Sequence, residues 1–457
     1  MLSSASQPTA FSARACSLAL AAALPFALVA CGGGSSTPPT YTVSGTLSTA
    51  SAAGLVLSDG SATFAVPAGS TSFAFPTPLA SGASYNVTVA SQPTALDQHC
   101  AVASGTGTVA TANISVAVTC RAVAWTTADI TAGTVFSAPY VDGPGTVATF
   151  RRVTSIARDA SGNLYVADAQ ESVIRKVTPQ GVVSTWAGLS GTSGHVDGPI
   201  ASATFYVPGG MAFDAAGNLY VADAYSVRKI SAAGIVSTFV GSPLGTTAGA
   251  GFVDGTASTA RFGSLNGLQL DIAGNLYVAD VTNHAIRKIT PDGTVTTLAG
   301  SGSTGFTDGT GSAATFTHPY KLALDSSGNL FVADASTVRK VTAAGVVTTI
   351  AGSPINTCVF NGDEATTAPD GMCAAIDVAV DVHDNVFVAD ESGSAIRKIS
   401  ATGVITTLYG GFQYQPAPLS LLLDADGSLI VGTDPIDIQD ATHNVVLGPK
   451  LLRLTGN

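Results

Sequence analysis

Apolar and polar residues alternate over short segments along most of the chain, and Gly, Pro, Ser or Asp separates one segment from the next. Side chains of a β-strand point alternately to its two faces, so this pattern predicts short strands with one buried face. Between residues 41 and 121 the segments, such as YTVSGTLS and ISVAVTC, follow one another without a regular period. We therefore expect residues 41–121 to form a small β-sandwich of antiparallel strands.

From residue 122 onward the pattern is periodic. The phrase GNLYVAD or a variant of it begins at six positions, which are residues 162, 217, 274, 328, 384 and 427. Each copy follows an apolar segment and a turn that starts with Asp, such as DASG, and further strand-like segments come after it. Four antiparallel strands repeated around an axis make the blades of a β-propeller, so residues 122–457 are predicted to form six blades.

The two ends of this periodic region complement each other. The sixth copy stops one strand short of a blade, whereas AVAWTTADI at 122–130 precedes the first copy without a partner of its own. We expect this N-terminal strand to complete the last blade, because an open ring would leave two unpaired strand edges.

The repeated phrase, together with TNHAIRK at 282–288, resembles the NHL repeat family. The resemblance covers about residues 124–457 and implies an all-β fold, a six-bladed β-propeller of the NHL type preceded here by the small β-sandwich. The segment 41–121 resembles the immunoglobulin-like modules that follow lipoprotein tethers, although it lacks the Cys-Trp-Cys signature. Such a module serves as a spacer or adheres to glycan or peptide.

The first 30 residues predict export. One positive charge at Arg14 precedes an apolar run, 15–30, that is too short for a transmembrane helix, so residues 1–30 are predicted to be a signal peptide. The letters LVA before Cys31 resemble the lipobox of bacterial lipoproteins, which implies lipidation of Cys31 and cleavage before it. An ordinary secretory signal is the alternative. Residues 31–40 then form a Gly/Ser/Pro tether, and the Gly after Cys31 favours, by resemblance, an outer-membrane location in the cell envelope.

Four further cysteines remain for an oxidising compartment, where disulfides are stable. We expect two local bridges, one between Cys100 and Cys120 around a predicted hairpin and one between Cys358 and Cys373 around a loop. Other pairings are formally possible, but local pairing keeps each bridge within one folding unit.

Composition narrows the classes of partner and chemistry. The formal net charge is -11, only 11% of residues are charged, and Lys and Arg form no stripe, which excludes a nucleic-acid partner. The motifs GxSxG, HExxH, CxxC and the Walker loop are absent. We therefore predict no catalytic residue, no metal ligand and no cofactor.

Asp and Arg recur together in the repeats, for example Asp168 with Arg175 and Asp223 with Arg228. We expect the carboxylates to tie turns and the guanidiniums to bridge neighbouring blades. Four connections carry a phrase such as VDGPGTVATF, in which Asp-Gly is expected to turn the chain and Phe to fill the space between blades. These features describe a scaffold rather than an active site.

Specificity should lie where the repeats differ, at the entry to the innermost strand of each blade. The candidates for the mouth of the central channel are Arg151, Arg152, Tyr206, Asn266, His318, Tyr320, Lys321 and Asp377. They predict a binding site for a protein, a peptide or a carbohydrate, although ordinary loop residues and a purely structural envelope role are alternatives. Some six-bladed relatives are metal-dependent lyases or lactonases, and for this chain that enzyme alternative requires a metal on the axis near His318 and Asp377.

Overall fold

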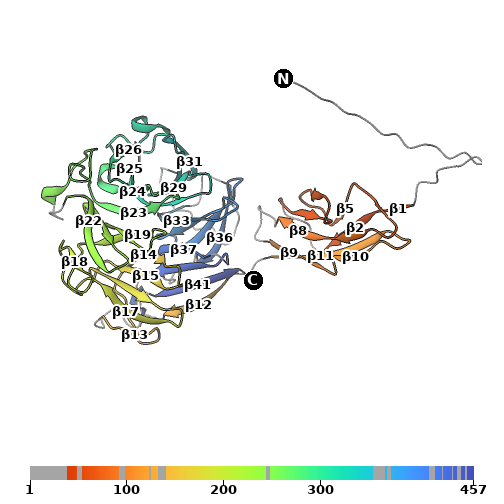
Figure 1. The fold of residues 1–457 in the computed structure, drawn as a ribbon, viewed down its shortest axis with the longest axis horizontal. Coiled ribbons are helices and arrows are strands. Elements are labelled where there is room, and N and C mark those ends of the chain that lie inside the picture. Colours follow the sequence, from red (N-terminus) through yellow and green to blue (C-terminus); the bar gives the residue numbers. More distant parts are fainter. Residues whose placement is uncertain are drawn as a thin grey trace, which may run out of the picture.

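The computed structural model describes residues 39–48, 54–91, 98–122, 125–131, 140–242, 247–353, 366–367, 372–410, 417–424, 426–434, 436–439, 444–447 and 450–456. Its regular elements are β-strands, apart from the short 3-10 helices η1 Thr247–Gly249, η2 Val281–Asn283 and η3 Gly311–Ala313. Within these ranges no helix is long and apolar enough to cross a membrane. The all-β prediction is confirmed (Figure 1).

The N-terminal part of the chain is a small sandwich. One sheet has the strand order β5-β2-β11-β9 and another β4-β3-β8. Side chains of both sheets, among them Val43, Leu57 and Val116, share one hydrophobic core. The strands are β1 Thr40–Tyr41, β2 Val43–Leu47, β3 Val56–Ser58, β4 Thr63–Ala65, β5 Ser72–Ala74, β6 Leu79–Ala80, β7 Ser84–Asn86, β8 Thr88–Ser91, β9 Gln98–Ala103, β10 Thr106–Thr108 and β11 Ile114–Ala122.

The sandwich differs from the prediction in one respect. β11 lies between β2 and β9, and it pairs in parallel with β2, whereas we expected only antiparallel strands. On its other side β11 pairs antiparallel with β9, which places Cys120 opposite Cys100, and the predicted disulfide between them is confirmed. Cys373 is also disulfide-bonded. Its expected partner, Cys358, lies outside the described residues, so that pairing stays a prediction.

The six blades surround one axis. The innermost strand of each blade contacts the innermost strand of the next, in the order β14, β19, β23, β28, β33, β37 and back to β14 (Figure 1). This closed ring confirms the predicted six-bladed propeller. The first three blades contain β14 Val153–Arg158, β15 Leu164–Asp168, β16 Val173–Val177 and β17 Val182–Ala187; β19 Pro208–Phe213, β20 Leu219–Asp223, β21 Ser226–Ile230 and β22 Ile235–Gly241; and β23 Leu265–Leu270, β24 Leu276–Asp280, β25 Ala285–Ile289 and β26 Val295–Ala299.

The other three blades follow the same order. They contain β28 Pro319–Leu324, β29 Leu330–Asp334, β30 Thr337–Val341 and β31 Val346–Gly352; β33 Ala375–Val380, β34 Val386–Asp390, β35 Ala395–Ile399 and β36 Val404–Gly410; and β37 Pro418–Leu423, β38 Leu429–Thr433, β41 Leu451–Gly456 and β12 Trp125–Thr131. In the last blade β39 Ile436–Gln439 and β40 Asn444–Leu447 form a separate hairpin between β38 and β41.

The N-terminal strand of the propeller belongs to the last blade. β12 pairs antiparallel with β41, from Trp125 opposite Gly456 to Thr131 opposite Leu451, and it is the outermost strand of the sheet β12-β41-β38-β37. The two ends of the propeller sequence therefore share one blade, so each edge of that blade is built from a different end of the chain.

The connections between blades also supply short outer strands and buried Phe side chains. Four blades carry a two-residue outer strand from the connection: β13 Gly143–Pro144, β18 Gly198–Pro199, β27 Gly309–Thr310 and β32 Thr366–Thr367. The Phe near the end of the first four connections, Phe150, Phe205, Phe262 or Phe316, is buried between two blades, as predicted. Phe205, for example, packs with Ile174 of the first blade and Leu219 of the second. Burying such a ring stabilises by about 1.5–3 kcal/mol, so each of these four connections fastens two blades together.

Deletion of residues 122–131 tests the closure. Without β12 the last blade loses its outermost strand and β41 becomes an unpaired edge, so we expect loss of the cooperative unfolding transition of the propeller and a tendency to aggregate. Trp186 on β17 is retained in this variant, and its fluorescence during thermal unfolding reports the transition. A deletion within the tether, residues 32–38, is the control and should leave the transition unchanged. An unchanged transition after removal of 122–131 would contradict the closure.

Candidate functional site

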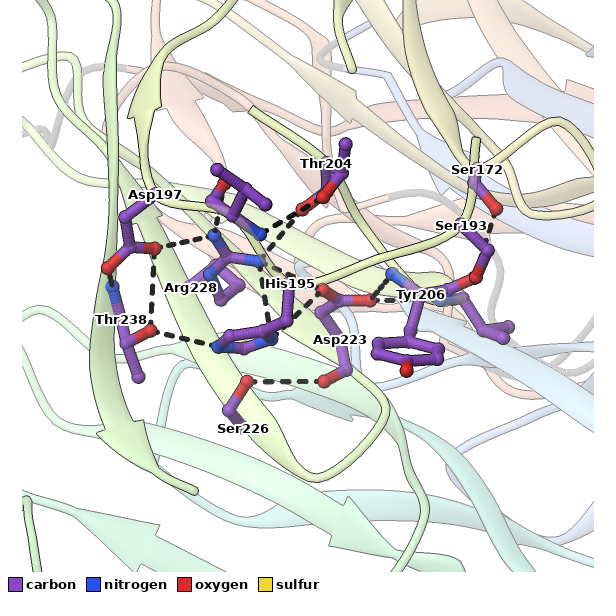
Figure 2. Close-up of polar contacts among 12 residues, drawn as sticks. Ser172, Ser193, His195, Asp197, Thr204, Tyr206, Asp223, Ser226, Arg228 and Thr238 are labelled. Carbon is purple, nitrogen blue, oxygen red and sulfur yellow. Dashed lines mark hydrogen bonds and ion pairs between the residues drawn. The ribbon is translucent and has the colours of Figure 1, made fainter. Parts of the chain in front are cut away.

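The mouth of the propeller is held in place by a buried carboxylate in five of the six blades. In the second blade this is Asp223, the last residue of β20 (Figure 2). Its Oδ1 accepts hydrogen bonds from the backbone N–H groups of Tyr206 and Val207, at 2.8 and 2.9 Å. The Asp at the same place in the other four blades that keep it receives backbone N–H groups of the same segment, as Asp168 does from Arg151 and Arg152. Each carboxylate thereby fixes the residues that lead into the innermost strand.

The carboxylate is in turn held by a fully buried arginine. Arg228 Nη1 donates to Asp223 Oδ2 at 3.2 Å, and Arg228 Nη2 donates to Asp197 Oδ1 at 2.6 Å (Figure 2). The same guanidinium donates to the carbonyl oxygens of Thr204 and Val196. Buried charges are tolerated only when they are paired and hydrogen-bonded, and this one has two carboxylates and two carbonyls.

The expectation that the guanidiniums bridge neighbouring blades is wrong. All hydrogen bonds of Arg228 within the described structure go to its own blade or to the connection, residues 193–207, that leads into that blade. Equivalent pairs occur in three other blades, between Arg175 and Asp142 at 2.6 Å, Arg287 and Asp254 at 2.6 Å, and Arg339 and Asp308 at 2.8 Å. Neighbouring blades are joined instead by the Phe of the same connection.

The second blade carries a histidine beside its buried arginine. In the first and third blades an aromatic ring, Tyr140 or Phe252, lies over the guanidinium at 4.1 and 4.9 Å. The corresponding residue of the second blade is His195, whose Nε2 lies 2.9 Å from Thr238 Oγ1 and whose Nδ1 lies 3.4 Å from Arg228 Nη1 (Figure 2). Burial, and then the charge of Arg228, lower the pKa of His195 from 6.5 to about 4. The imidazole is therefore neutral at pH 7.

Two adjoining cavities form the mouth at one end of the axis. The larger, about 370 Å³, lies over the second blade and is bounded by the first three blades. The smaller, about 110 Å³, lies on the opposite side, towards the fourth to sixth blades. Thr154 and Asn266 line both cavities, so the two adjoin each other.

The larger cavity is apolar with several polar groups and no charged side chain. Val207, Pro208 and Leu265 line it together with Tyr206 and Tyr225. Tyr225 stands at the turn between β20 and β21, which brings a second aromatic side chain to the same cavity. Tyr206 and Asn266, predicted as mouth residues, therefore meet here.

The smaller cavity is charged. Arg152 and Glu391 line it beside Tyr320, and Asp434 lies near enough to influence both charges. Burial and then the charge of Asp434 raise the pKa of Glu391, while Arg152 opposes the rise. Burial also raises the pKa of Asp434, again opposed by Arg152. Arg152 therefore balances two carboxylates rather than standing alone as an anion site.

Lys321 and Asp377 lie deeper in the channel than expected. Lys321, on β28, is 7% exposed and Asp377, on β33, is 5% exposed. Lys321 Nζ donates to Asp377 Oδ2 at 3.2 Å and to the carbonyl oxygen of Thr154, on the opposite blade. Asp377 Oδ2 also accepts the backbone N–H of Leu421 at 2.9 Å. The pair thus links four blades across the axis and separates the mouth from a third cavity at the other end, which is lined by Gln269 among others.

The remaining two predicted residues lie at the rim. Arg151 pairs with Glu171 at 2.9 Å and lines neither mouth cavity. His318 is exposed and stacks on Tyr320, with 6.2 Å between ring centroids, and the ring of His284 lies 5.8 Å from that of His318. His318 and Asp377, which the enzyme alternative places around one metal, thus have separate surroundings. Among the described residues no group of three or more His, Cys, Asp or Glu side chains is placed to hold a metal ion.

Sequence reasoning missed Thr154, Tyr225 and Glu391 as lining residues. Tyr225 and Glu391 follow the VAD phrase by two residues and one residue, in the turn between the second and third strands, where the copies differ in length. An aromatic or charged residue in that turn was a usable signal, because this turn opens on the same face as the entry to the innermost strand.

Comparison with known proteins supports the fold. No known family model matches the chain. Teneurin-m of Drosophila melanogaster is 26% identical over 279 residues, which are 53% of this chain and 10% of Teneurin-m. The chain spans a tenth or less of the length of the curated relatives it matches.

Two solved structures from Bacteroides thetaiotaomicron are similar over most of the chain. One is a protein of unknown function, with a TM-score of 0.52 and 14% identity, and the other is an auxiliary nutrient binding protein, with a TM-score of 0.50 and 10% identity. Each alignment covers 88% of this chain and 90% of the other. Residues 125–456 are about three quarters of the chain, so the similarity extends beyond the propeller. At these identities it shows the fold alone.

Replacement of His195 by Phe, which copies Phe252 of the third blade, tests the buried cluster. Because the folded pKa of His195 is lowered, its stability contribution is complete above pH 6.5 and is lost as the pH falls towards 4. His195→Phe should remove this loss. The difference in unfolding free energy between the variant and the wild type should therefore shift by about 1–2 kcal/mol in favour of the variant as the pH is lowered from 7.5 to 5. Urea unfolding followed by tryptophan fluorescence measures the unfolding free energy at each pH. If the unfolding free energies of the two proteins change in parallel with pH, His195 is not buried in the neutral form.

Proposed function

We propose that this protein is an NHL-type propeller lipoprotein of the bacterial cell envelope that binds a ligand in the mouth formed by the two cavities. The proposed signal peptide, residues 1–30, and the lipobox before Cys31 support a lipid anchor in the membrane, and Gly32 favours the outer membrane. The sandwich, for which we propose an immunoglobulin-like spacer role, holds the propeller away from that membrane.

The observation that carries this proposal is the set of unpaired polar groups in the mouth. The hydroxyl groups of Tyr206, Tyr225 and Tyr320 and the side-chain amide of Asn266 make no hydrogen bond with any described residue, although all four residues are partly buried. By contrast, the buried Asp side chains and the terminal guanidinium nitrogens of the buried Arg in the blades bind one another and the backbone. Binding sites combine an apolar cavity with a few converging polar groups, and the mouth has this composition.

A related fold with a stated binding role adds support. The similar structure from Bacteroides thetaiotaomicron is described as an auxiliary nutrient binding protein, and its alignment covers both parts of this chain. The net charge of -11 disfavours nucleic acids and other anionic partners, and a protein that binds a ligand at the cell envelope does not require such a partner.

A thermal-shift panel on the purified protein tests the proposal. The probes are neutral sugars, charged sugars, free amino acids and short peptides, each at millimolar concentration. We expect at least one probe to raise the Tm of the wild type by several degrees, because a ligand that binds only the folded state stabilises it. Asn266→Ala should reduce that shift at least by half.

The matched control is Gln269→Ala, which changes a polar residue on the same strand at the other end of the channel. It should leave the shift unchanged. A shift that Asn266→Ala and Gln269→Ala affect equally, or no shift with any probe, would contradict a binding site in the mouth.

A further inference from the structure

The larger mouth cavity exists because one innermost strand lacks a side chain. At the position that faces the mouth, the six innermost strands carry Thr154, Gly209, Asn266, Tyr320, Ile376 and Leu419. Gly209 leaves open the space over the second blade that a side chain occupies elsewhere. A Cβ on Gly209 would lie 2.8 Å from the carbonyl oxygen of Asn266, so the neighbouring strand also approaches too closely for any other residue. The cavity is therefore set to one side of the axis.

The lining of this cavity selects for an uncharged ligand. The charged side chains of the mouth, Arg152, Lys321 and Glu391, line the smaller cavity and not this one. A charged group placed here would lose its water without gaining a partner of opposite charge. A purely apolar group would instead cover Tyr206, Tyr225 and Asn266 and leave their polar atoms buried without partners, at a cost of about 1–3 kcal/mol each.

The ligand must therefore present an apolar face and several hydroxyl groups together. Val207, at the lip of the cavity, is 54% exposed, and Pro208 and Leu265 extend its apolar surface inward. The hydroxyls of Tyr206 and Tyr225 and the Asn266 amide supply both donors and acceptors. A sugar ring has C–H groups on its faces and hydroxyls around its edge, which matches this distribution. At about 370 Å³ the cavity is near the lower end of the usual range of ligand pockets, roughly 300–1,000 Å³.

We propose that the larger cavity binds one neutral sugar residue, with a ring face against Val207 and Leu265 and its hydroxyls on Asn266 and the two tyrosines. This inference rests on the proposed function and narrows it to a carbohydrate ligand and to the cavity over the second blade. The smaller, charged cavity next to it holds the continuation of a longer glycan.

Saturation-transfer NMR and calorimetry on the full protein test the inference. The neutral probes are methyl α-D-glucopyranoside, methyl β-D-galactopyranoside and N-acetyl-D-glucosamine. D-glucuronate and D-glucosamine are the charged sugars that serve as controls for the neutral ones, and N-acetyl-leucinamide represents an apolar peptide. We expect at least one neutral sugar to bind, and the charged sugars to bind at least tenfold more weakly.

Three variants locate the site. Tyr206→Phe removes one hydroxyl and should weaken sugar binding roughly fivefold, as expected for one hydrogen bond. Asn266→Ala should weaken it at least tenfold, and Gln269→Ala, at the far end of the channel, should have no effect. An unchanged Tm in each variant without ligand shows that the propeller is intact.

The outcomes separate this inference from the proposed function. If N-acetyl-leucinamide or a charged sugar binds better than every neutral sugar, and Asn266→Ala abolishes that binding, the mouth binds a ligand but the sugar inference is overturned. Sugar binding that none of the mouth variants weakens overturns the assignment of this cavity. If no probe of any class binds, both the sugar inference and the proposed binding function are contradicted.

Discussion

The structure depends on a fully buried arginine held between two carboxylates. One carboxylate, Asp223 in the second blade, ends a strand of the blade, and the other, Asp197, belongs to the connection that leads into it. Removing one partner of such a buried pair leaves the other charge uncompensated and costs about 3–5 kcal/mol, a large share of the stability of a domain. In four of the six blades the interaction therefore ties the connection to its own blade, and the Phe of that connection ties the blade to the one before. Repetition of this unit builds most of the ring.

The same carboxylate links the framework to the mouth. By accepting the backbone N–H groups of Tyr206 and Val207, Asp223 fixes where their side chains emerge. The framework is nearly the same in each blade, so the differences among blades are free to set the chemistry of the mouth. Gly209 opens a cavity over the second blade, Tyr320 fills the equivalent space over the fourth, and Lys321 with Asp377 closes the channel below.

Much of this was predictable from sequence because it repeats. Six copies of one phrase predicted six blades, and the Phe of the connections was correctly assigned to the space between them. What could not be predicted depends on distances across the axis. Lys321 and Asp377 occupy equivalent positions in neighbouring copies, but only the ring geometry brings their side chains together and buries them. The second carboxylate on each arginine was missed for the same reason, since Asp197 and Arg228 are 31 residues apart.

Amide hydrogen exchange of Tyr206 and Val207 in an Asp223→Ala variant tests the central claim most directly. We predict that both amides exchange at least tenfold faster than in the wild type, because they lose their acceptor, while amides within β20 such as that of Val221 stay protected. Unchanged protection of Tyr206 and Val207 in a folded variant would show that the buried carboxylate does not hold the mouth in place.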